Sequence, residues 1–269
     1  MGLIVCPTPI GNLEDVTLRV LSALREADVV ACEDTRRTRT LLDRYGVSAK
    51  LVSYHEHNEE QRSAELVERM RGGATVALVS DAGMPLVSDP GYVLVRACVA
   101  AGLSVEVLPG PSAALAALVA SALPADRWRF AGFLPRKAGE LRKVLAEPGG
   151  TLVAFESPRR VPGTLALLAG IDPERQVAVC RELTKVHEEV VRGSAAELAG
   201  RYADAPPRGE VVLVLGPPAE GAAGEGPPTG LDEVRRLVDA GAKPRVAAQV
   251  VADLTGGSAN RLYAALTQM

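Results

Sequence analysis

Short apolar runs alternate with polar loops along most of this chain. Runs of about four to eight apolar residues that are bounded by Gly, Pro, Ser and Asp are typical of buried strands. We therefore predict strands at residues 3–6, 28–32, 50–54, 76–79, 103–108, 128–133, 151–155, 176–180 and 211–215. Apolar residues at helical spacing fill the stretches between them, and this alternation of strands with helices predicts an α/β fold.

Changes in composition divide the chain into parts. Residues 122–126 (Ala-Leu-Pro-Ala-Asp) are typical of a linker, so we predict two α/β domains, residues 1–121 and 122–217. Residues 218–230 are rich in Pro, Gly, Ala and Glu, which predicts a second linker. The remaining residues, 231–269, show short helical patterns broken by glycines and predict a small helical domain of helix-turn-helix size.

The loop that follows the apolar run 76–79 is the most informative stretch. Residues 81–91 contain two prolines, two aspartates and two glycines, and a helical pattern follows them. In α/β sheets, ligands bind at such loops beyond the carboxyl ends of strands. A plain connecting loop is the alternative, but long ordered loops are usually functional. Similar loops follow other strands at 7–12, 109–113 and 156–160, so we predict a ligand site built from strand-end loops.

Acidic and basic residues are concentrated at several of these strand ends. Glu33 and Asp34 follow one predicted strand, and three arginines follow within five residues. Either Asp34 caps a helix with a solvated basic face, or the arginines lie at the mouth of the sheet, where they could meet phosphates. Basic pairs also occur at 136–137 and 159–160. The net charge of −3 argues against a general polyanion binder but leaves room for a local basic patch.

Composition narrows the class of protein. With 269 residues, 47% hydrophobic and 23% charged, the chain is expected to be a soluble globular protein. No apolar run approaches the roughly 20 residues of a membrane span, and we expect no signal peptide. The four cysteines are scattered, which predicts reduced thiols and a cytoplasmic location. His55 and His57 lack a third ligand at a recognisable spacing, so we expect no metal site.

With these loops identified, eight segments together resemble a known family. They are 7–13 (Pro-Thr-Pro-Ile-Gly-Asn-Leu), 33–36 (Glu-Asp-Thr-Arg), 53–59 (Ser-Tyr-His-Glu-His-Asn-Glu), 80–85 (Ser-Asp-Ala-Gly-Met-Pro), 88–91 (Ser-Asp-Pro-Gly), 109–113 (Pro-Gly-Pro-Ser-Ala), 132–137 (Gly-Phe-Leu-Pro-Arg-Lys) and 155–159 (Phe-Glu-Ser-Pro-Arg). In order and with few gaps, they are similar to the bacterial 16S ribosomal RNA (cytidine-2′-O)-methyltransferases of the small subunit methyltransferase I family. That family belongs to the tetrapyrrole methylase superfamily. No single motif is specific, but the combination is.

The resemblance implies a fold and an activity. It implies two α/β domains of the tetrapyrrole methylase type, with S-adenosylmethionine in the cleft between them, and a small C-terminal helical appendage. It also implies a homodimer that methylates the ribose of a cytidine in the decoding centre of 16S rRNA, cytidine 1402 of that RNA, in the small ribosomal subunit. Superfamily members that methylate tetrapyrroles have a more glycine-rich first loop than residues 8–12 of this chain, which favours the RNA branch.

The resemblance also implies roles for particular residues. Cofactor contacts are expected from Pro9, Asp81, Gly83, Met84, Pro85, Ser112, Ala113, Phe155 and Leu213. RNA contacts are expected from Arg36, Arg37, Arg39, Arg136, Arg159 and Arg160. A ribose hydroxyl needs a general base, and strand ends offer Glu33, Asp34, His55, Glu156, Lys137 and Lys185. Our hypothesis is that Asp34 or Glu156 lies near the hydroxyl and that Lys137 stabilises charge.

Two other functions are weighed against RNA methylation. One is a methyltransferase that acts on a tetrapyrrole or another small molecule, against which the basic loops argue. The other is an RNA-binding assembly factor without enzymatic activity, whose pocket is vestigial. Cofactor binding would separate this last possibility from the two enzymes.

Overall fold

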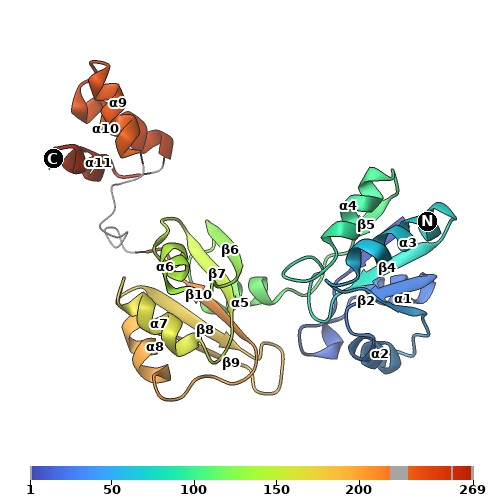
Figure 1. Cartoon of the computed structure of the whole chain (residues 1–269). Helices are drawn as coiled ribbons and strands as arrows, with labels where there is room; N and C mark the ends of the chain where they lie inside the picture. Colours follow the sequence, from blue (N-terminus) through green and yellow to red (C-terminus); the bar gives the residue numbers. More distant parts are fainter. Residues whose placement is uncertain (1, 219–229, 256, 268–269) are drawn as a thin grey trace. The chain divides into compact units, whose positions relative to one another are not determined.

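The computed structural model describes residues 2–218, 230–255 and 257–267. The chain forms two compact units, residues 1–222 and 223–269. Most of the predicted linker 218–230 lies outside the described residues. The predicted α/β fold with a small helical part is confirmed, and Figure 1 labels its helices and strands.

The first half of the larger unit is built on a parallel sheet. Its strands are β1 (Gly2–Cys6), β2 (Val29–Cys32), β3 (Leu51–Ser53), β4 (Thr75–Val79) and β5 (Val105–Val107), in the order β3-β2-β4-β1-β5. Every pairing among them is parallel. Their carboxyl ends therefore meet at one edge, where the loops 7–12, 33–34, 80–91 and 108–112 leave the sheet.

Helices cover both faces of this sheet. They are α1 (Leu18–Glu26), α2 (Thr35–Arg44), α3 (Glu59–Arg71) and α4 (Tyr92–Ala100), and a short 3-10 turn, η1 (Leu13–Asp15), precedes α1. Alternate strand residues pack against α3 and α4 on one face and against α1 and α2 on the other. Because both faces are buried, the strands consist of nearly continuous apolar runs, which is why the sequence pattern locates them well.

The second half contains a mixed sheet. Its strands are β6 (Trp128–Phe133), β7 (Thr151–Glu156), β8 (Gln176–Arg181), β9 (Glu189–Ser194) and β10 (Val211–Leu215), in the order β6-β7-β10-β8-β9. β6 and β7 are parallel, whereas the other pairs are antiparallel. β9 is absent from the predicted strands. It forms an edge of the sheet, and its sequence, Glu-Val-Val-Arg-Gly-Ser, lacks an apolar run.

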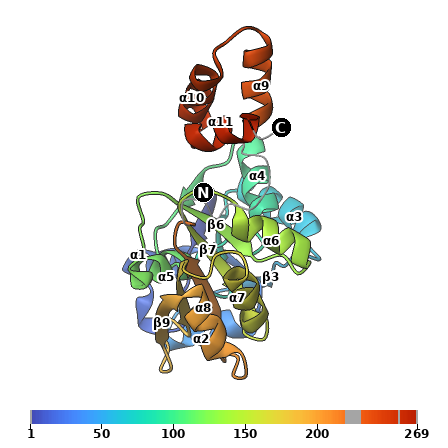
Figure 2. The same cartoon turned by 90° about the vertical axis from the view of Figure 1, so that its left-hand side faces the viewer.

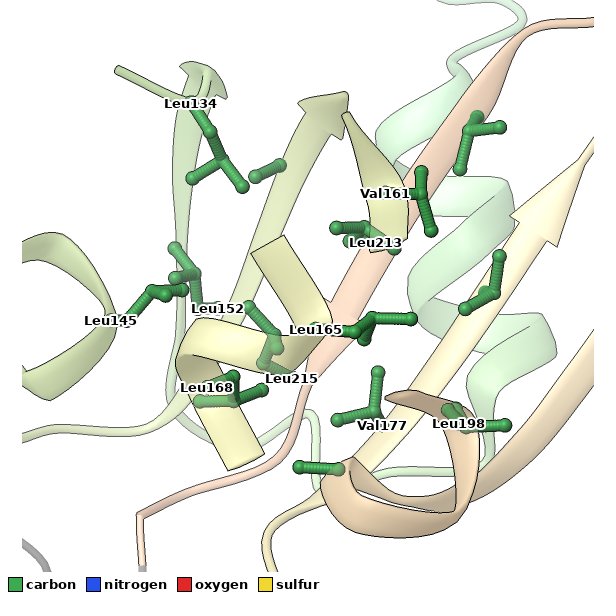
Figure 3. Close-up of a cluster of buried hydrophobic side chains, with 14 of the residues drawn as sticks. Leu134, Leu145, Leu152, Val161, Leu165, Leu168, Val177, Leu198, Leu213 and Leu215 are labelled. Atoms are coloured by element: carbon green, nitrogen blue, oxygen red, sulfur yellow. The ribbon is translucent and has the colours of Figure 1, made fainter. Parts of the chain in front are cut away.

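Two layers of helices enclose the mixed sheet. One face packs against α6 (Ala138–Ala146), α7 (Val161–Ala169) and α8 (Ala195–Tyr202), around a core of leucines and valines (Figure 3). The other face packs against α5 (Ala113–Ser121). Although α5 follows the first sheet in sequence, its contacts are with β7, β8, β9 and β10 of the second. Its small side chains, such as Ala114 and Ala117, let the helix lie close to those strands.

The smaller unit is a cluster of three helices, α9 (Leu231–Asp239), α10 (Pro244–Thr255) and α11 (Ala259–Thr267), shown in Figure 2. Its core includes Val234, Ala247, Val251 and Leu262. The predicted helical appendage is thus confirmed. Over the described residues of the whole chain, no helix is long and apolar enough to span a bilayer.

A buried arginine joins three elements of the second half. Arg175 is only 3% exposed; its Nε donates to the carbonyl oxygen of Gly216 at 2.7 Å, and its Nη1 to that of Leu145 at 2.5 Å. Burial lowers the pKa of its guanidinium to about 10, which still leaves it charged at neutral pH. The start of β8 is thereby tied to the ends of β10 and α6.

We expect the substitution Arg175→Met to lower the free energy of unfolding by about 2–4 kcal/mol, because it leaves two buried carbonyl groups without their charged donor. Denaturant unfolding would measure this loss. The matched control is Arg142→Met on α6, where the arginine is exposed and the expected change is within about 0.5 kcal/mol. Equal effects of the two substitutions would contradict the structural role of Arg175.

Candidate functional site

A cleft of about 530 Å³ lies at the strand ends of the larger unit. Its lining comes from both halves: loops of the first sheet on one side, and β7, β8, β10 and the loops beside them on the other. Six of the predicted cofactor residues line it, namely Asp81, Gly83, Met84, Ser112, Ala113 and Phe155. The sequence thus placed six of its nine expected cofactor residues at the cleft, and their contact with the cofactor stays a prediction.

The floor of the cleft depends on a backbone bridge between two loops. Thr8 N donates to Gly83 O at 2.8 Å, and Gly83 N donates to Thr8 O at 2.9 Å. Gly83 has a φ of 80°, a conformation that favours glycine. The next turns of the loop hold Leu86 and Ser88 at φ values of 72° and 66°. Strained backbone of this kind is concentrated at functional sites, because surrounding structure must hold it in place.

The polar wall of the cleft is organised by Asp81. Its Oδ1 accepts a hydrogen bond from Asp34 N at 3.0 Å, and its Oδ2 pairs with Arg37 Nη1 at 3.4 Å. Asp34 itself caps α2 and pairs with Arg36 at 2.7 Å. These hydrogen bonds from Arg36 hold the pKa of the Asp34 carboxyl well below its usual range. Asp34 does not line the cleft, and such a weakly basic carboxylate is poorly suited to accept a proton.

Glu33 and Asp89 are also among the acidic residues that line the cleft. Burial, together with the charges of Glu33 and Asp81, raises the pKa of Asp89 to about 6. Burial and the nearby charge of Asp81 likewise raise the pKa of Glu33. Glu33 was among the candidate bases from the sequence, whereas Asp89 was missed. Its position in the same loop as Asp81 was the available signal.

The apolar wall of the cleft is aromatic. Phe155 lies between Phe130 and Phe133, with ring centroids 5.0 Å and 5.4 Å away. Val212 and Cys180 also line this side. Burial raises the pKa of the Cys180 thiol to about 11, so the thiol is unreactive at neutral pH.

Three predicted cofactor residues lie elsewhere. Leu213 follows Val212 on β10, so its side chain points to the opposite face of the sheet, into the core shown in Figure 3. Pro9 and Pro85 are buried within their loops and do not line the cleft.

Two of the predicted catalytic side chains are in unsuitable surroundings. The Glu156 side chain is fully buried; its Oε1 accepts from Ser157 N at 2.7 Å, and its Oε2 accepts from Thr164 Oγ1 at 2.7 Å. Both oxygens are thus occupied by structural hydrogen bonds, although Glu156 is part of the cleft wall. Lys137 is 83% exposed, pairs with Glu140 and does not line the cleft.

The predicted RNA-binding arginines fall into three groups. Arg37 lines the cleft, where it pairs with Asp81. Exposed positions outside the cleft lining are held by Arg36, Arg39, Arg136 and Arg159. Arg160 is half-buried, and its guanidinium donates to the carbonyl oxygens of Leu134 and Pro135 at 3.0 Å and 2.5 Å. It therefore shapes the loop 134–135 and is less available to a ligand.

The two halves of the larger unit also contact each other through residues 11–12 and 184–185, a contact for which the sequence contains no signal. Asn12 N donates to Thr184 Oγ1 at 3.0 Å, and a side chain at Gly11 would meet Lys185 Cγ at 2.4 Å. Lys185 Nζ in turn lies 2.9 Å from carboxylate oxygens of Glu182 and Glu210. This lysine, a candidate base from the sequence, is thus held in ion pairs.

The two neighbouring histidines lie at the start of the segment before α3. The ring centroids of His55 and His57 are 5.9 Å apart. Over the described residues, no group of three or more His, Cys, Asp and Glu side chains has an arrangement that could hold a metal ion.

Comparisons with known proteins all find similarity to methyltransferases. The family model of the tetrapyrrole (corrin/porphyrin) methylases matches residues 2–199. The ribosomal RNA small subunit methyltransferase I of Mesorhizobium japonicum is 47% identical over 100% of this chain and 92% of its own length. The enzyme of that name from Escherichia coli O157:H7 is 40% identical over 97% of this chain and 93% of its own length.

Solved structures share the fold. A uroporphyrin-III-C-methyltransferase from Thermus thermophilus is 25% identical, with a TM-score of 0.58 over 80% of this chain and 93% of its own. A second structure of this enzyme, complexed with S-adenosyl homocysteine, is 23% identical with a TM-score of 0.57 over 80% and 97% of the two chains. The expected tetrapyrrole methylase fold is therefore confirmed.

The raised pKa of Asp89 gives a prediction about stability. Since its pKa of about 6 lies above the unfolded value of about 3.9, the folded state binds the proton more tightly. Stability is therefore lost as pH rises from about 4 to about 6. Asp89→Asn removes this loss. The melting temperature of the variant minus that of the wild type should therefore be larger at pH 7.5 than at pH 4.5, by at least about 2 °C.

Thermal unfolding at the two pH values would measure the effect. Asp43→Asn is the matched control, because Asp43 is exposed on α2 and lies outside the cleft lining. Its shift in melting temperature should be the same at both pH values. A pH-independent effect of Asp89→Asn would show that the carboxyl is not held in its protonated form.

Proposed function

The chain belongs to the ribosomal RNA small subunit methyltransferase I family of tetrapyrrole methylases, and we propose that it methylates the ribose 2′-hydroxyl of a cytidine in 16S rRNA. As a member of this family it is an S-adenosylmethionine-dependent rRNA methyltransferase. The finer statement, a 2′-O-methyl group at cytidine 1402, is our proposal. Its support is the set of loop motifs at the strand ends.

The observation that carries the proposal is the composition of the cleft. Its volume of about 530 Å³ is within the range of small-molecule sites, about 300–1,000 Å³. One wall includes the backbone around Gly83 and Ala113, and the other includes Phe155 and Val212. We assign the methionine part of S-adenosylmethionine to the backbone wall and the adenine to the aromatic wall, since amide groups suit a carboxylate and rings suit a base.

Methyl transfer from a sulfonium is a direct displacement, so the chain must align the hydroxyl oxygen with the methyl carbon and the sulfur. The hydroxyl also needs a group that accepts its proton. We assign this role to the carboxylates of Glu33 and Asp89, two residues that line the cleft and have raised pKa values. They replace Asp34 and Glu156 in our hypothesis, because the former has a lowered pKa and the latter is fully hydrogen-bonded.

For the RNA, we propose a basic rim around the cleft. Its members are Arg37 at the cleft and the exposed Arg36, Arg39, Arg136, Lys137 and Arg159. These side chains would contact phosphates, which orient the RNA without reading its sequence. The support is their exposure on loops and helix ends next to the cleft-lining residues 33, 37, 133 and 158.

The assembly is also a proposal. We propose a cytoplasmic homodimer whose α/β domains comprise residues 1–121 and 122–217, as the resemblance implies. Exposed apolar side chains support a partner surface on the larger unit: Tyr92 and Val99 on α4 are each 65% exposed, and Val119 on α5 is 79% exposed.

The proposed reaction is tested by incubating the protein with labelled S-adenosylmethionine and small ribosomal subunits from a strain that lacks the modification. We expect the label to appear as 2′-O-methylcytidine after nucleoside analysis. Subunits that already carry the modification are the control and should accept no label. Label on a base, or on the ribose of a nucleoside other than cytidine, would contradict the proposal.

The basic rim is tested by charge reversal. We expect Arg39→Glu and Arg136→Glu to weaken binding to small subunits about three- to tenfold each, with a shallower dependence on salt, because each removes a phosphate contact. The affinity for S-adenosylhomocysteine, measured by calorimetry, should change less than about twofold, because neither arginine lines the cleft. Arg69→Glu on α3, also exposed and outside the cleft lining, is the control. An equal loss with the control would refute a specific rim.

A further inference from the structure

Of the two phenylalanines in the cleft lining, Phe155 belongs to the proposed adenine wall, whereas Phe133 stands at its edge beside the basic loop. Phe133 lines the cleft and is 65% exposed. The chain has three phenylalanines, and the other two, Phe130 and Phe155, are both partly buried against the core between α5 and the second sheet. Singly exposed apolar side chains are common on protein surfaces, so the exposure of Phe133 gains its meaning from its place in the cleft lining.

The backbone aims Phe133 at the cleft through a bulge in β6. Phe130 pairs with Val153, and Phe133 pairs with Phe155, so two residues of β6 stand opposite the single residue Ala154 of β7. In a regular strand, residues three apart point to opposite faces. The extra residue brings Phe133 to the same side as Phe130, where both rings contact Phe155. Bulges that re-aim a side chain are frequent next to active sites.

Gly132 makes this bulge possible. Its φ is 61°, which favours glycine, and a β-carbon there would lie 3.5 Å from Ser88 Oγ of the first half. Ser88 also lines the cleft. Phe133 therefore lies beside the place where the two halves approach each other, and its ring contacts the ring of Phe155. The two rings meet at 63°, so they do not stack in parallel, and most of the Phe133 ring stays exposed.

The residues after Phe133 are basic and exposed. Arg136 and Lys137 follow it in the same loop, and Arg159 is exposed in the loop after β7. An aromatic ring next to basic side chains is the usual arrangement for an unstacked nucleotide, whose base stacks on the ring while its phosphates meet the charges. A nucleotide whose ribose enters a cleft must leave its helical stack, and the exposed base then needs a new partner.

We propose that Phe133 is the stacking platform for the base of the nucleotide that is methylated. This inference rests on the proposed function, since it assumes an RNA substrate. The adenine of S-adenosylmethionine is the other planar base that enters the cleft. The RNA base is favoured because Phe133 lies beside the basic loop, whereas Phe155, Val212 and Cys180 form an apolar wall without it.

The test replaces Phe133 by Ala, Leu, Tyr and Trp and measures two quantities for each variant. The first is kcat/KM for methylation of unmodified small subunits, and the second is the calorimetric affinity for S-adenosylhomocysteine. We expect Phe133→Ala and Phe133→Leu to lower kcat/KM about 5- to 100-fold, because each removes one base–aromatic stack. Phe133→Tyr and Phe133→Trp should keep kcat/KM within about threefold of the wild-type value, since both retain an aromatic face. Cofactor affinity should change less than about twofold in all four variants.

Each other outcome overturns the inference. A parallel loss of cofactor affinity in the Ala and Leu variants assigns the ring to adenine. Wild-type kcat/KM in every variant means that the ring contacts no base, and equal loss in all four means that only the shape of Phe133 matters. Melting temperatures within about 2 °C of the wild type would show that folding is intact, as the exposure of the ring leads us to expect. A wild-type protein that transfers no label overturns the proposed function as well, whereas an active wild type separates the two.

Discussion

The candidate site depends on the pair of backbone hydrogen bonds between Thr8 and Gly83. They join the loops after β1 and β4, which neighbour each other in a parallel sheet and so leave it at the same edge. The left-handed conformation of Gly83 allows the second loop to turn back onto the first. From this junction the contacts extend outward: Asp81 fixes the start of α2 through Asp34, and the loop around Asn12 meets Thr184 of the second half.

The distribution of charge follows from the same geometry. The carboxyl groups of Glu33, Asp81 and Asp89 are brought within electrostatic reach of one another by the strand ends, and Arg37 compensates part of their charge. The cleft is therefore acidic inside, whereas the exposed arginines lie on α2 and on the loops after β6 and β7. An acidic interior suits a cationic sulfonium, and the proposed basic rim suits a polyanion, within a protein whose net charge is −3.

Much of this was predictable from the sequence, for identifiable reasons. Strands buried on both faces give clear apolar runs, so nine of the ten strands in the described residues were located. The strand ends and the segments that follow them supplied six of the residues that line the cleft. β9 escaped because an edge strand needs no apolar run. The sequence also could not show which face of β10 meets the cleft. Leu213 was therefore expected at the cofactor, whereas in the structure Val212 lines the cleft and Leu213 lies in the core. The burial of Glu156 depends on its contacts with Thr164 and Ser157, which only the fold reveals.

The position of α5 bears on how this architecture can change during evolution. The helix is connected to the last strand of the first sheet, yet its alanines lie on the second sheet, and its first residues, Ser112 and Ala113, line the cleft. The halves are consequently not interchangeable modules. A chimaera that joined the first half of one homologue to the second half of another would have to match the surfaces of α5 and β8–β10, or lose the core and the cleft together. Selection on this helix therefore acts on both halves at once.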